Sequence, residues 1–179
     1  MGAKLMEFLK EVTPHVARVA IIVNPPTNAA RLPSSVQRTA IALGTEPVLA
    51  EVYDVQGLED AIVSFARQPD GGIVVPADIF TETHRDLIIT LAARFKLPAI
   101  YAFRSNAMAG GLLSYGVDQL AEYAGAATYV DRILRGATPG DLPVQFPTKY
   151  EMVVNLKTAK ALGLAVPPSI LLRADEVIE

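Results

Sequence analysis

The clearest fold signal in this chain is an apolar run, Val19-Ala20-Ile21-Ile22-Val23, followed at once by the loop sequence Asn24-Pro25-Pro26-Thr27-Asn28. A continuous run rich in β-branched residues predicts a central strand that is covered on both faces. The two prolines exclude a helix from the loop, because each lacks a backbone donor and restricts the residue before it. Helical periodicity resumes over Ala29–Leu43, so this region predicts a strand, a loop and a helix in succession.

The same alternation continues along the chain. Three further apolar runs follow the first and recur about every 25 to 30 residues, with a helical pattern in each gap. These runs are Pro47–Tyr53, Gly72–Val75 and Pro98–Tyr101. They predict an α/β fold, a three-layer αβα sandwich with a parallel sheet in flavodoxin-like strand order. Ligands bind outside the carboxyl ends of such strands, so we expect function in Asn24–Ala29, Pro76–Thr81 and Ala102–Asn106.

Composition excludes several classes of function. The chain has 179 residues, of which 51% are hydrophobic, so it can bury a substantial core as one domain with an appendage. Its net charge of −3, without clustered Lys or Arg, excludes nucleic acid as a partner. Without cysteine it has no disulfide, thiolate nucleophile or cysteine-bound metal. Charged residues interrupt Met1–Val12, so we expect no signal peptide, and no apolar run is long enough to span a membrane.

The regular alternation stops after Tyr101. We expect the glycine-containing segment Gly110–Gly116 to be a crossing, followed by a helix over Gln119–Leu134. Lys149–Val154 then predicts one more strand, and Leu156–Leu162 one more helix. The chain therefore divides into an α/β domain at residues 1–104, a crossing segment at residues 105–147, and a recrossing strand, helix and tail at residues 148–179.

The helix expected at Gln119–Leu134 carries a strip of small side chains. They are Ala121, Ala124, Gly125, Ala126, Ala127 and Thr128. Small side chains allow another backbone to approach closely, so this strip is built to be covered. The cover comes either from an element outside the chain or from another subunit, and a homodimer through Gly111–Leu134 is one expectation.

The most specific motifs lie in the carboxyl-terminal third. They are Asp141-Leu142-Pro143-Val144, Thr148-Lys149-Tyr150-Glu151, Asn155-Leu156-Lys157-Thr158-Ala159-Lys160-Ala161-Leu162-Gly163-Leu164, Pro167-Pro168 and Arg173-Ala174-Asp175-Glu176-Val177-Ile178. Upstream, Gly110-Gly111-Leu112-Leu113-Ser114-Tyr115-Gly116-Val117-Asp118 and Asp131-Arg132-Ile133-Leu134-Arg135-Gly136 complete the pattern. Through these motifs the chain resembles the ABC-transporter substrate-binding proteins of the tryptophan/tyrosine-transporter type.

The resemblance implies a type I periplasmic-binding-protein lobe. Such proteins clamp a small organic solute, here an amino acid or related carboxylate, between two α/β lobes, and an ABC permease reads the closed form. It also implies a periplasmic location and neither catalytic residues nor a cofactor. The match begins about where the second lobe starts, so most of the first lobe is expected to be absent. The alternative is an α/β module that binds no ligand and oligomerises through its small-residue surface.

The loop after the first strand offers polar ligand-binding groups. Asn24, Thr27 and Asn28 are candidates to bind a carboxylate or amide beside the amino terminus of the following helix. The alternative is that these residues only shape a turn and cap that helix.

Two charged residues follow later strands. By the resemblance, Asp78 lies at the cleft and accepts hydrogen bonds from a substrate ammonium, whereas the alternative is an ordinary loop acid. Thr81 or Thr83 is expected to cap a helix that runs through Leu87, Ile88, Leu91 and Ala92 to Phe95. Arg104 is a candidate to bind a carboxylate with its bidentate fork, and the alternative is an exposed surface arginine.

Aromatic residues end strands at the same sheet edge. Phe80, Tyr101 and Phe103 are candidates to stack on the body of a ligand, although core packing is an equal alternative for Tyr101. Ser114 and Tyr115 lie in the expected crossing, so we assign them as hinge residues rather than ligand contacts.

The sequence lacks the motifs of metal sites and of common enzymes. Thr83-His84-Arg85-Asp86 has one histidine among charged residues, a pattern typical of a solvated helix face, so no metal is expected. No Gly-x-Ser-x-Gly elbow is present, and Gly71-Gly72 precedes a strand instead of joining a strand to a helix. We therefore expect a binding protein rather than a hydrolase or a dinucleotide-dependent enzyme.

Overall fold

The fold is a three-layer α/β sandwich. The computed structural model describes residues 2–27 and 31–179, and within them seven strands form one sheet in the order β2-β1-β3-β4-β5-β6-β7. The strands are β1 (Arg18–Val23), β2 (Glu46–Glu51), β3 (Gly71–Val75), β4 (Ala99–Tyr101), β5 (Leu113–Val117), β6 (Tyr150–Asn155) and β7 (Glu176–Ile178). The first five follow the flavodoxin-like order, which confirms the predicted fold class.

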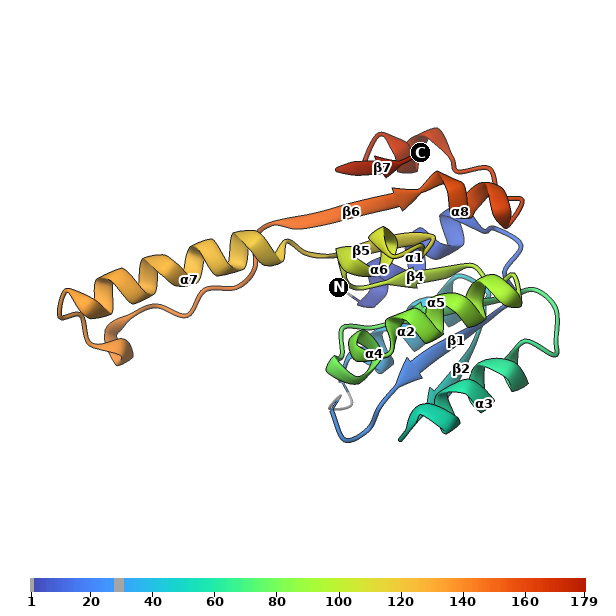
Figure 1. Ribbon diagram of the computed structural model, residues 1–179, viewed down its shortest axis with the longest axis horizontal. Helices are drawn as coiled ribbons and strands as arrows, with labels where there is room; N and C mark the ends of the chain where they lie inside the picture. Colours follow the sequence, from blue (N-terminus) through green and yellow to red (C-terminus); the bar gives the residue numbers. More distant parts are fainter. Residues whose placement is uncertain (1, 28–30) are drawn as a thin grey trace.

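Helices cover both faces of this sheet (Figure 1). The helices of the described residues are α1 (Gly2–Val12), α2 (Arg31–Ala42), α3 (Val55–Phe65), α4 (Ile79–Thr83), α5 (Arg85–Arg94), α6 (Arg104–Met108), α7 (Gln119–Leu134), α8 (Leu156–Ala161) and α9 (Pro168–Leu171), of which α7 projects away from the sheet. On one face, Leu5 of α1, Val36 of α2 and Ile170 of α9 belong to one buried cluster. On the other face, Leu58 of α3 and Ile88 of α5 belong to a second cluster. The sheet therefore has a hydrophobic core on each side.

Strand β1 shows why its sequence is apolar throughout. Val19, Ile21 and Val23 point into the core that contains α1, whereas Ala20 and Ile22 point into the core that contains α3. Side chains alternate between the two faces of a strand, so a strand covered on both faces needs apolar residues at every position. The prediction of a doubly covered central strand is confirmed.

The sheet is parallel except where β5 meets β6. These two strands pair antiparallel, with Leu113 opposite Val154 and Val117 opposite Tyr150. Antiparallel pairing arises because the chain leaves the sheet after β5 and returns along nearly the same line (Figure 1). Among the described strands this pair departs from the predicted parallel sheet, while β7 is again parallel to its neighbour β6.

The segment predicted to be a crossing is instead part of the sheet. Ser114 and Tyr115 lie within β5, where Ser114 pairs with Tyr101 on one side and with Val153 on the other. The sheet thus continues beyond residue 104, and the chain leaves it only at Asp118. The hinge role of Ser114 and Tyr115 stays a prediction, although neither residue lies in a crossing.

Residues 118–149 form an arm that projects from the sheet (Figure 1). The arm contains α7, at the predicted bounds, a turn of 3₁₀ helix at Pro139–Asp141, and an extended return segment. No residue of α7 is buried. Its exposed apolar side chains are Leu120, Tyr123, Val130, Ile133 and Leu134, and Val144 and Phe146 of the return segment are exposed as well. No helix among the described residues is sufficiently long and apolar to cross a membrane.

Candidate functional site

A polar network joins the carboxyl ends of β1 and β3. Thr27 Oγ1, from the loop after β1, lies 2.6 Å from Asp78 Oδ2, which follows β3. The same hydroxyl oxygen lies 2.6 Å from Asn24 Oδ1. A hydroxyl carries one proton, and a carboxylate is the stronger acceptor, so Thr27 donates to Asp78. Three residues predicted to share one edge of the sheet are therefore in contact.

Asp78 is fixed in place by both of its carboxylate oxygens. Its Oδ1 accepts hydrogen bonds from the backbone N–H groups of Phe80 at 2.9 Å and Thr81 at 3.3 Å, which makes Asp78 the N-cap of α4. The prediction that Thr81 or Thr83 caps the helix running to Phe95 is wrong, because that helix, α5, begins at Arg85 with His84 at its N-cap, and both threonines lie within α4. Asp78 is only 6% exposed, so the carboxylate lies at the rim of the core and not on a solvated loop.

Asn24 links two segments of the chain. Its Nδ2 donates to the carbonyl oxygen of Val52 at 2.9 Å, which ties the loop after β1 to the end of β2. Its Oδ1 accepts from the backbone N–H of Thr27 at 3.2 Å. This pattern closes the Asn-Pro-Pro-Thr turn, so the turn-shaping role foreseen for these residues is present. The third candidate in this loop, Asn28, lies outside the described residues.

A hollow of about 350 Å³ adjoins the polar network along the same edge. It is lined by Ala77, Ala102, Phe103, Val117, Gln119, Glu122 and Tyr123, and we call it the edge hollow. Ala77 directly precedes Asp78 in the chain, so the edge hollow and the network are neighbours. Its lining combines the ends of β3, β4 and β5 with the first turns of α7. Polar groups beside an apolar concavity are the usual composition of a small-molecule site.

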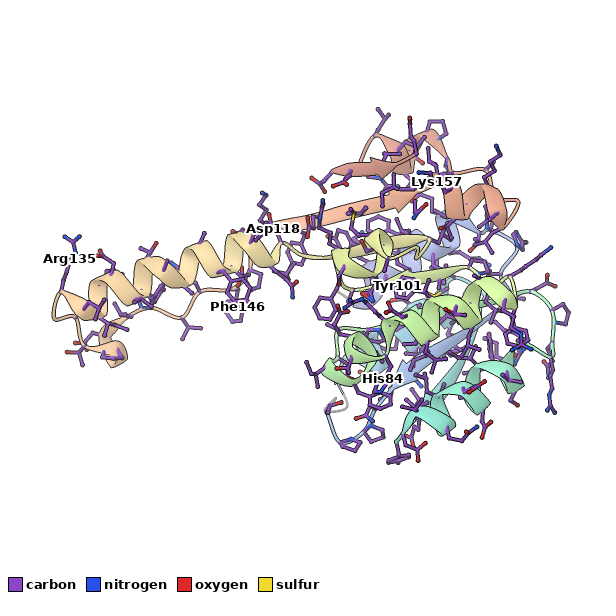
Figure 2. All side chains as sticks on the ribbon, in the orientation of Figure 1. His84, Tyr101, Asp118, Arg135, Phe146 and Lys157 are labelled. Atoms are coloured by element: carbon purple, nitrogen blue, oxygen red, sulfur yellow. The ribbon has the colours of Figure 1, made fainter. Side chains whose placement is uncertain are left out.

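The predicted aromatic residues separate into different environments. Tyr101 is 1% exposed and packs in the core that contains α3 and α5, which is the core-packing alternative left open by the sequence. Burial raises the pKa of its phenol. Figure 2 shows Tyr101 inside the body of the sandwich. Phe80 is half-buried, and the centroid of its ring lies 4.4 Å from the centroid of the His84 ring. Phe103 lines the edge hollow.

Arg104 is engaged by two carboxylates of this chain. Its guanidinium donates to Glu176 of β7, and a second guanidinium nitrogen lies 3.5 Å from Glu151 of β6. The guanidinium of Arg104, which the sequence predicts to bind a ligand carboxylate, instead links α6 to β7, the last strand of the sheet. Burial raises the pKa of Glu151, an effect that Arg104 opposes.

The root of the arm is held by a second set of contacts. Asp118 caps α7 by accepting from the N–H of Ala121 at 3.0 Å, and its other oxygen lies 2.7 Å from Lys149 Nζ. The hydrogen bond from Lys149 lowers the pKa of Asp118, and the bond from Ala121 adds to this effect. Beside them the rings of Tyr115 and Tyr150 stack with centroids 5.8 Å apart. Asp118 is labelled at this root in Figure 2.

Four residues of the edge hollow were not among the sequence candidates. They are Val117, which ends β5, and Gln119, Glu122 and Tyr123, which follow β5 just as the predicted loops follow β1, β3 and β4. A signal for them exists, because an aspartate directly before a helical pattern marks a helix start. Asp118 is such a residue. Because the segment before Asp118 is predicted as a crossing and not as a strand, the sequence does not indicate that this helix starts at the edge of the sheet.

A larger groove of about 880 Å³ lies within the arm itself, between α7 and the return segment. Its two walls are joined where Tyr129 Oη donates to the carbonyl oxygen of Pro143 at 2.5 Å. Phe146, labelled in Figure 2, belongs to its lining. Phe103 lines the edge hollow, whereas none of the described sequence candidates lines this groove, so the edge hollow is the better candidate site. Neither the groove nor the edge hollow is lined by Asn24, Thr27, Asp78, Phe80, Tyr101 or Arg104.

Solved structures with this fold are longer than this chain. A conserved domain protein from Vibrio cholerae matches with a TM-score of 0.89 and 28% identity, over 98% of this chain and 60% of that one. A Streptococcus pneumoniae domain in complex with L-Trp matches with a TM-score of 0.86 and 22% identity, over 99% and 62%. A ligand-free, open substrate-binding protein from Clostridium difficile matches at 0.68 and 21%, over 98% and 59%.

Sequence comparisons agree with the structural ones. A tyrosine-binding protein from Clostridioides difficile is 25% identical over 162 residues, which cover 90% of this chain and 47% of that protein. The chain thus spans about half the length of that curated relative. The family model for ABC transporter substrate binding proteins matches residues 3–178, nearly the whole chain. Since that match extends from α1 to β7, the chain belongs to the family of ABC transporter substrate-binding proteins, which are binding proteins and not enzymes.

Proposed function

We propose that this chain is a lobe of the solute-binding component of an ABC importer, and that it binds an amino acid at the carboxyl edge of β1, β3, β4 and β5. The observation that carries the proposal is the contact between Thr27 and Asp78, which brings two loops together directly beside the edge hollow.

The site is suited to a solute with a polar end and an apolar body. Asn24, Thr27 and Asp78 supply an amide, a hydroxyl and a carboxylate at one end. Ala102 and Phe103 supply apolar surface at the other. A free amino acid has this division, and two relatives are named for L-Trp or tyrosine. We therefore propose an amino acid with an aromatic side chain.

The proposed function involves two partners outside this chain. In the longer relatives the matched region covers about 60% of the molecule. We propose that a further lobe closes over the polar network and the edge hollow, and that a membrane permease takes up the closed form. The proposed location is outside the cytoplasmic membrane, as in the periplasm, where importers collect their solutes.

Ligand-induced stabilisation tests this proposal. Saturating L-tryptophan or L-tyrosine is expected to raise the melting temperature of the chain, because a ligand that binds only the folded state stabilises it. The gain is about 2.7 kcal/mol at 100 times the dissociation constant. The measurement is differential scanning fluorimetry, with the D-enantiomers as matched controls. An unchanged melting temperature with every L-amino acid tested would contradict the proposal.

A second candidate function is self-association through the arm. The exposed α7 residues Leu120, Tyr123, Ala127, Val130 and Leu134 are spaced alternately by three and four positions, the spacing of a two-helix seam. If the chain forms a dimer through α7, light scattering at micromolar concentration is expected to give twice the mass of one chain. Val130→Glu, at an exposed seam position, then restores the mass of a single chain. A single-chain mass for the unaltered protein excludes the candidate.

A further inference from the structure

We infer that Tyr123 is a specificity-determining residue: with Phe103 it forms the aromatic walls of the edge hollow, which admits an uncharged aromatic side chain and rejects an anionic one. The inference rests on the proposed function and assigns a role within that site to a residue of the arm.

The edge hollow is built from two separate parts of the molecule. Ala77, Ala102 and Phe103 belong to the ends of β3 and β4, and Val117 ends β5. Tyr123 belongs to α7, the first element of the arm. The side chain of a bound solute therefore touches the sheet and the arm together, and Tyr123 is the aromatic ring that the arm contributes.

The first turns of α7 are fixed relative to the sheet. The backbone N–H of Asp118 donates to the carbonyl oxygen of Lys149 at 3.1 Å, and the side chains of these two residues form an ion pair at 2.7 Å. Asp118 also caps α7 through the N–H of Ala121. Gln119 and Tyr123 are four positions apart, so they share one face of the helix. The pinned helix start thus presents both side chains to the edge hollow.

Tyr123 has surface available for a ligand. Its side chain is 74% exposed although it borders an apolar concavity. An aromatic ring in this position gains burial and ring contacts when an aromatic group fills the space beside it. Phe103, which the end of β4 contributes to the lining, is half-buried and offers the second ring. A volume of about 350 Å³ is at the small end for ligand sites, which suits one ring system with its polar end at the Asp78 network.

The charges around the edge hollow oppose an anionic side chain. Glu122 contributes a carboxylate to the lining, and Asp78 directly follows the lining residue Ala77 in the chain. Among the residues that the structure describes, the lining contains no lysine or arginine. The adjacent Arg104 is turned to Glu151 and Glu176 and so does not offset these negative charges. A second carboxylate placed in this space would meet like charges without a cation.

Isothermal titration of four proteins tests the inference. L-tryptophan, L-tyrosine and L-glutamate are titrated into the unaltered chain, Tyr123→Ala, Tyr123→Phe and Leu120→Ala. Tyr123→Ala is expected to weaken binding of L-tryptophan about tenfold, the upper size of an aromatic pair contact. Tyr123→Phe keeps the ring and is expected to retain the affinity. Leu120→Ala alters an equally exposed α7 residue outside the edge hollow and is expected to change nothing.

The outcomes separate this inference from the proposed function. If the unaltered chain binds L-tryptophan and Tyr123→Ala binds it equally well, the role of Tyr123 is wrong while the proposed function stands. Binding of L-glutamate as tight as that of L-tryptophan overturns the charge argument. If the unaltered chain binds none of the three amino acids, both the proposed function and the role of Tyr123 are overturned.

Discussion

Replacing Gly116 by alanine is expected to destabilise the protein by about 3 kcal/mol or more. A Cβ at this position would lie 1.8 Å from the carbonyl oxygen of Ala102, whereas real Cβ contacts below 3.0 Å are essentially never seen. Neither the backbone of Gly116 nor that of Ala102 can move easily, because both are held by neighbouring strands. Gly116 pairs with Glu151 of β6, and the N–H of Ala102 donates to the carbonyl oxygen of Val75 at 3.1 Å. The added methyl group must therefore push β5 away from the end of β4.

The matched control for this change is Gly125→Ala in α7. A Cβ at Gly125 meets no atom within 4 Å, and alanine is favoured over glycine inside a helix by roughly 0.5 to 1 kcal/mol. Urea unfolding is expected to show a large loss of stability for Gly116→Ala and a small gain for Gly125→Ala. Equal midpoints for the unaltered chain and Gly116→Ala would show that the close approach of Gly116 to Ala102 is not as described.

Most of the sheet follows from local sequence. Strand β1 is apolar at every position because both of its faces are covered, and that pattern is visible without knowledge of its neighbours. The predicted runs Gly72–Val75 and Pro98–Tyr101 agree with β3 and β4 to within one residue at each end. Helix α7 begins and ends where the pattern of the sequence placed it. In each case the residue type is dictated by burial along a single element.

Strand β5 shows what local sequence does not reveal. Glycine is a poor strand former, so the sequence predicts a crossing over Gly110–Gly116, which overlaps β5. Gly116 is required because the backbone of Ala102 occupies the space of a side chain, and Ser114 is buried between β4 and β6. Both requirements come from elements distant in sequence. The antiparallel partner β6 lies beyond the entire arm, so its pairing with β5 has no local signature.

The sequence predicts only part of the candidate site, because the rest depends on contacts between elements that are distant in sequence. That Asn24, Thr27 and Asp78 would meet follows from strand order, since the ends of parallel strands share one edge. The direction of a side chain at a strand end does not follow from its position, and Tyr101 turns into the core while Phe103 lines the edge hollow. The sequence does not indicate Tyr123 as a site residue, because Tyr123 lies at that edge only as part of the arm. The arm starts at the end of β5, a strand that the sequence does not predict.

Replacing Asp78 by alanine is expected to have two effects, on stability and on ligand binding. The variant loses the N-cap of α4 and the partner of the Thr27 hydroxyl, with an expected cost of about 2 kcal/mol. It also removes the contact that holds the loop after β1 beside the edge hollow. The stabilisation of the chain by L-tryptophan is therefore expected to disappear in a thermal shift experiment.

Asp54→Ala separates the two effects. Asp54 caps α3 by accepting from the N–H of Gly57 at 2.7 Å, so its loss costs a cap of the same kind, about 1 kcal/mol. Asp54 is exposed, and its side chain has no bond to Thr27 or Asn24. The Asp54→Ala protein is expected to melt at a lower temperature yet respond fully to L-tryptophan. If Asp78→Ala also keeps the full response, Asp78 is a helix cap alone and the ligand is bound elsewhere.

Asp78→Asn completes the comparison, because asparagine caps a helix as well as aspartate does but lacks its charge. A stable Asp78→Asn protein without the response to L-tryptophan would assign binding to the negative charge of Asp78, rather than to the shape of the loop that Asp78 holds.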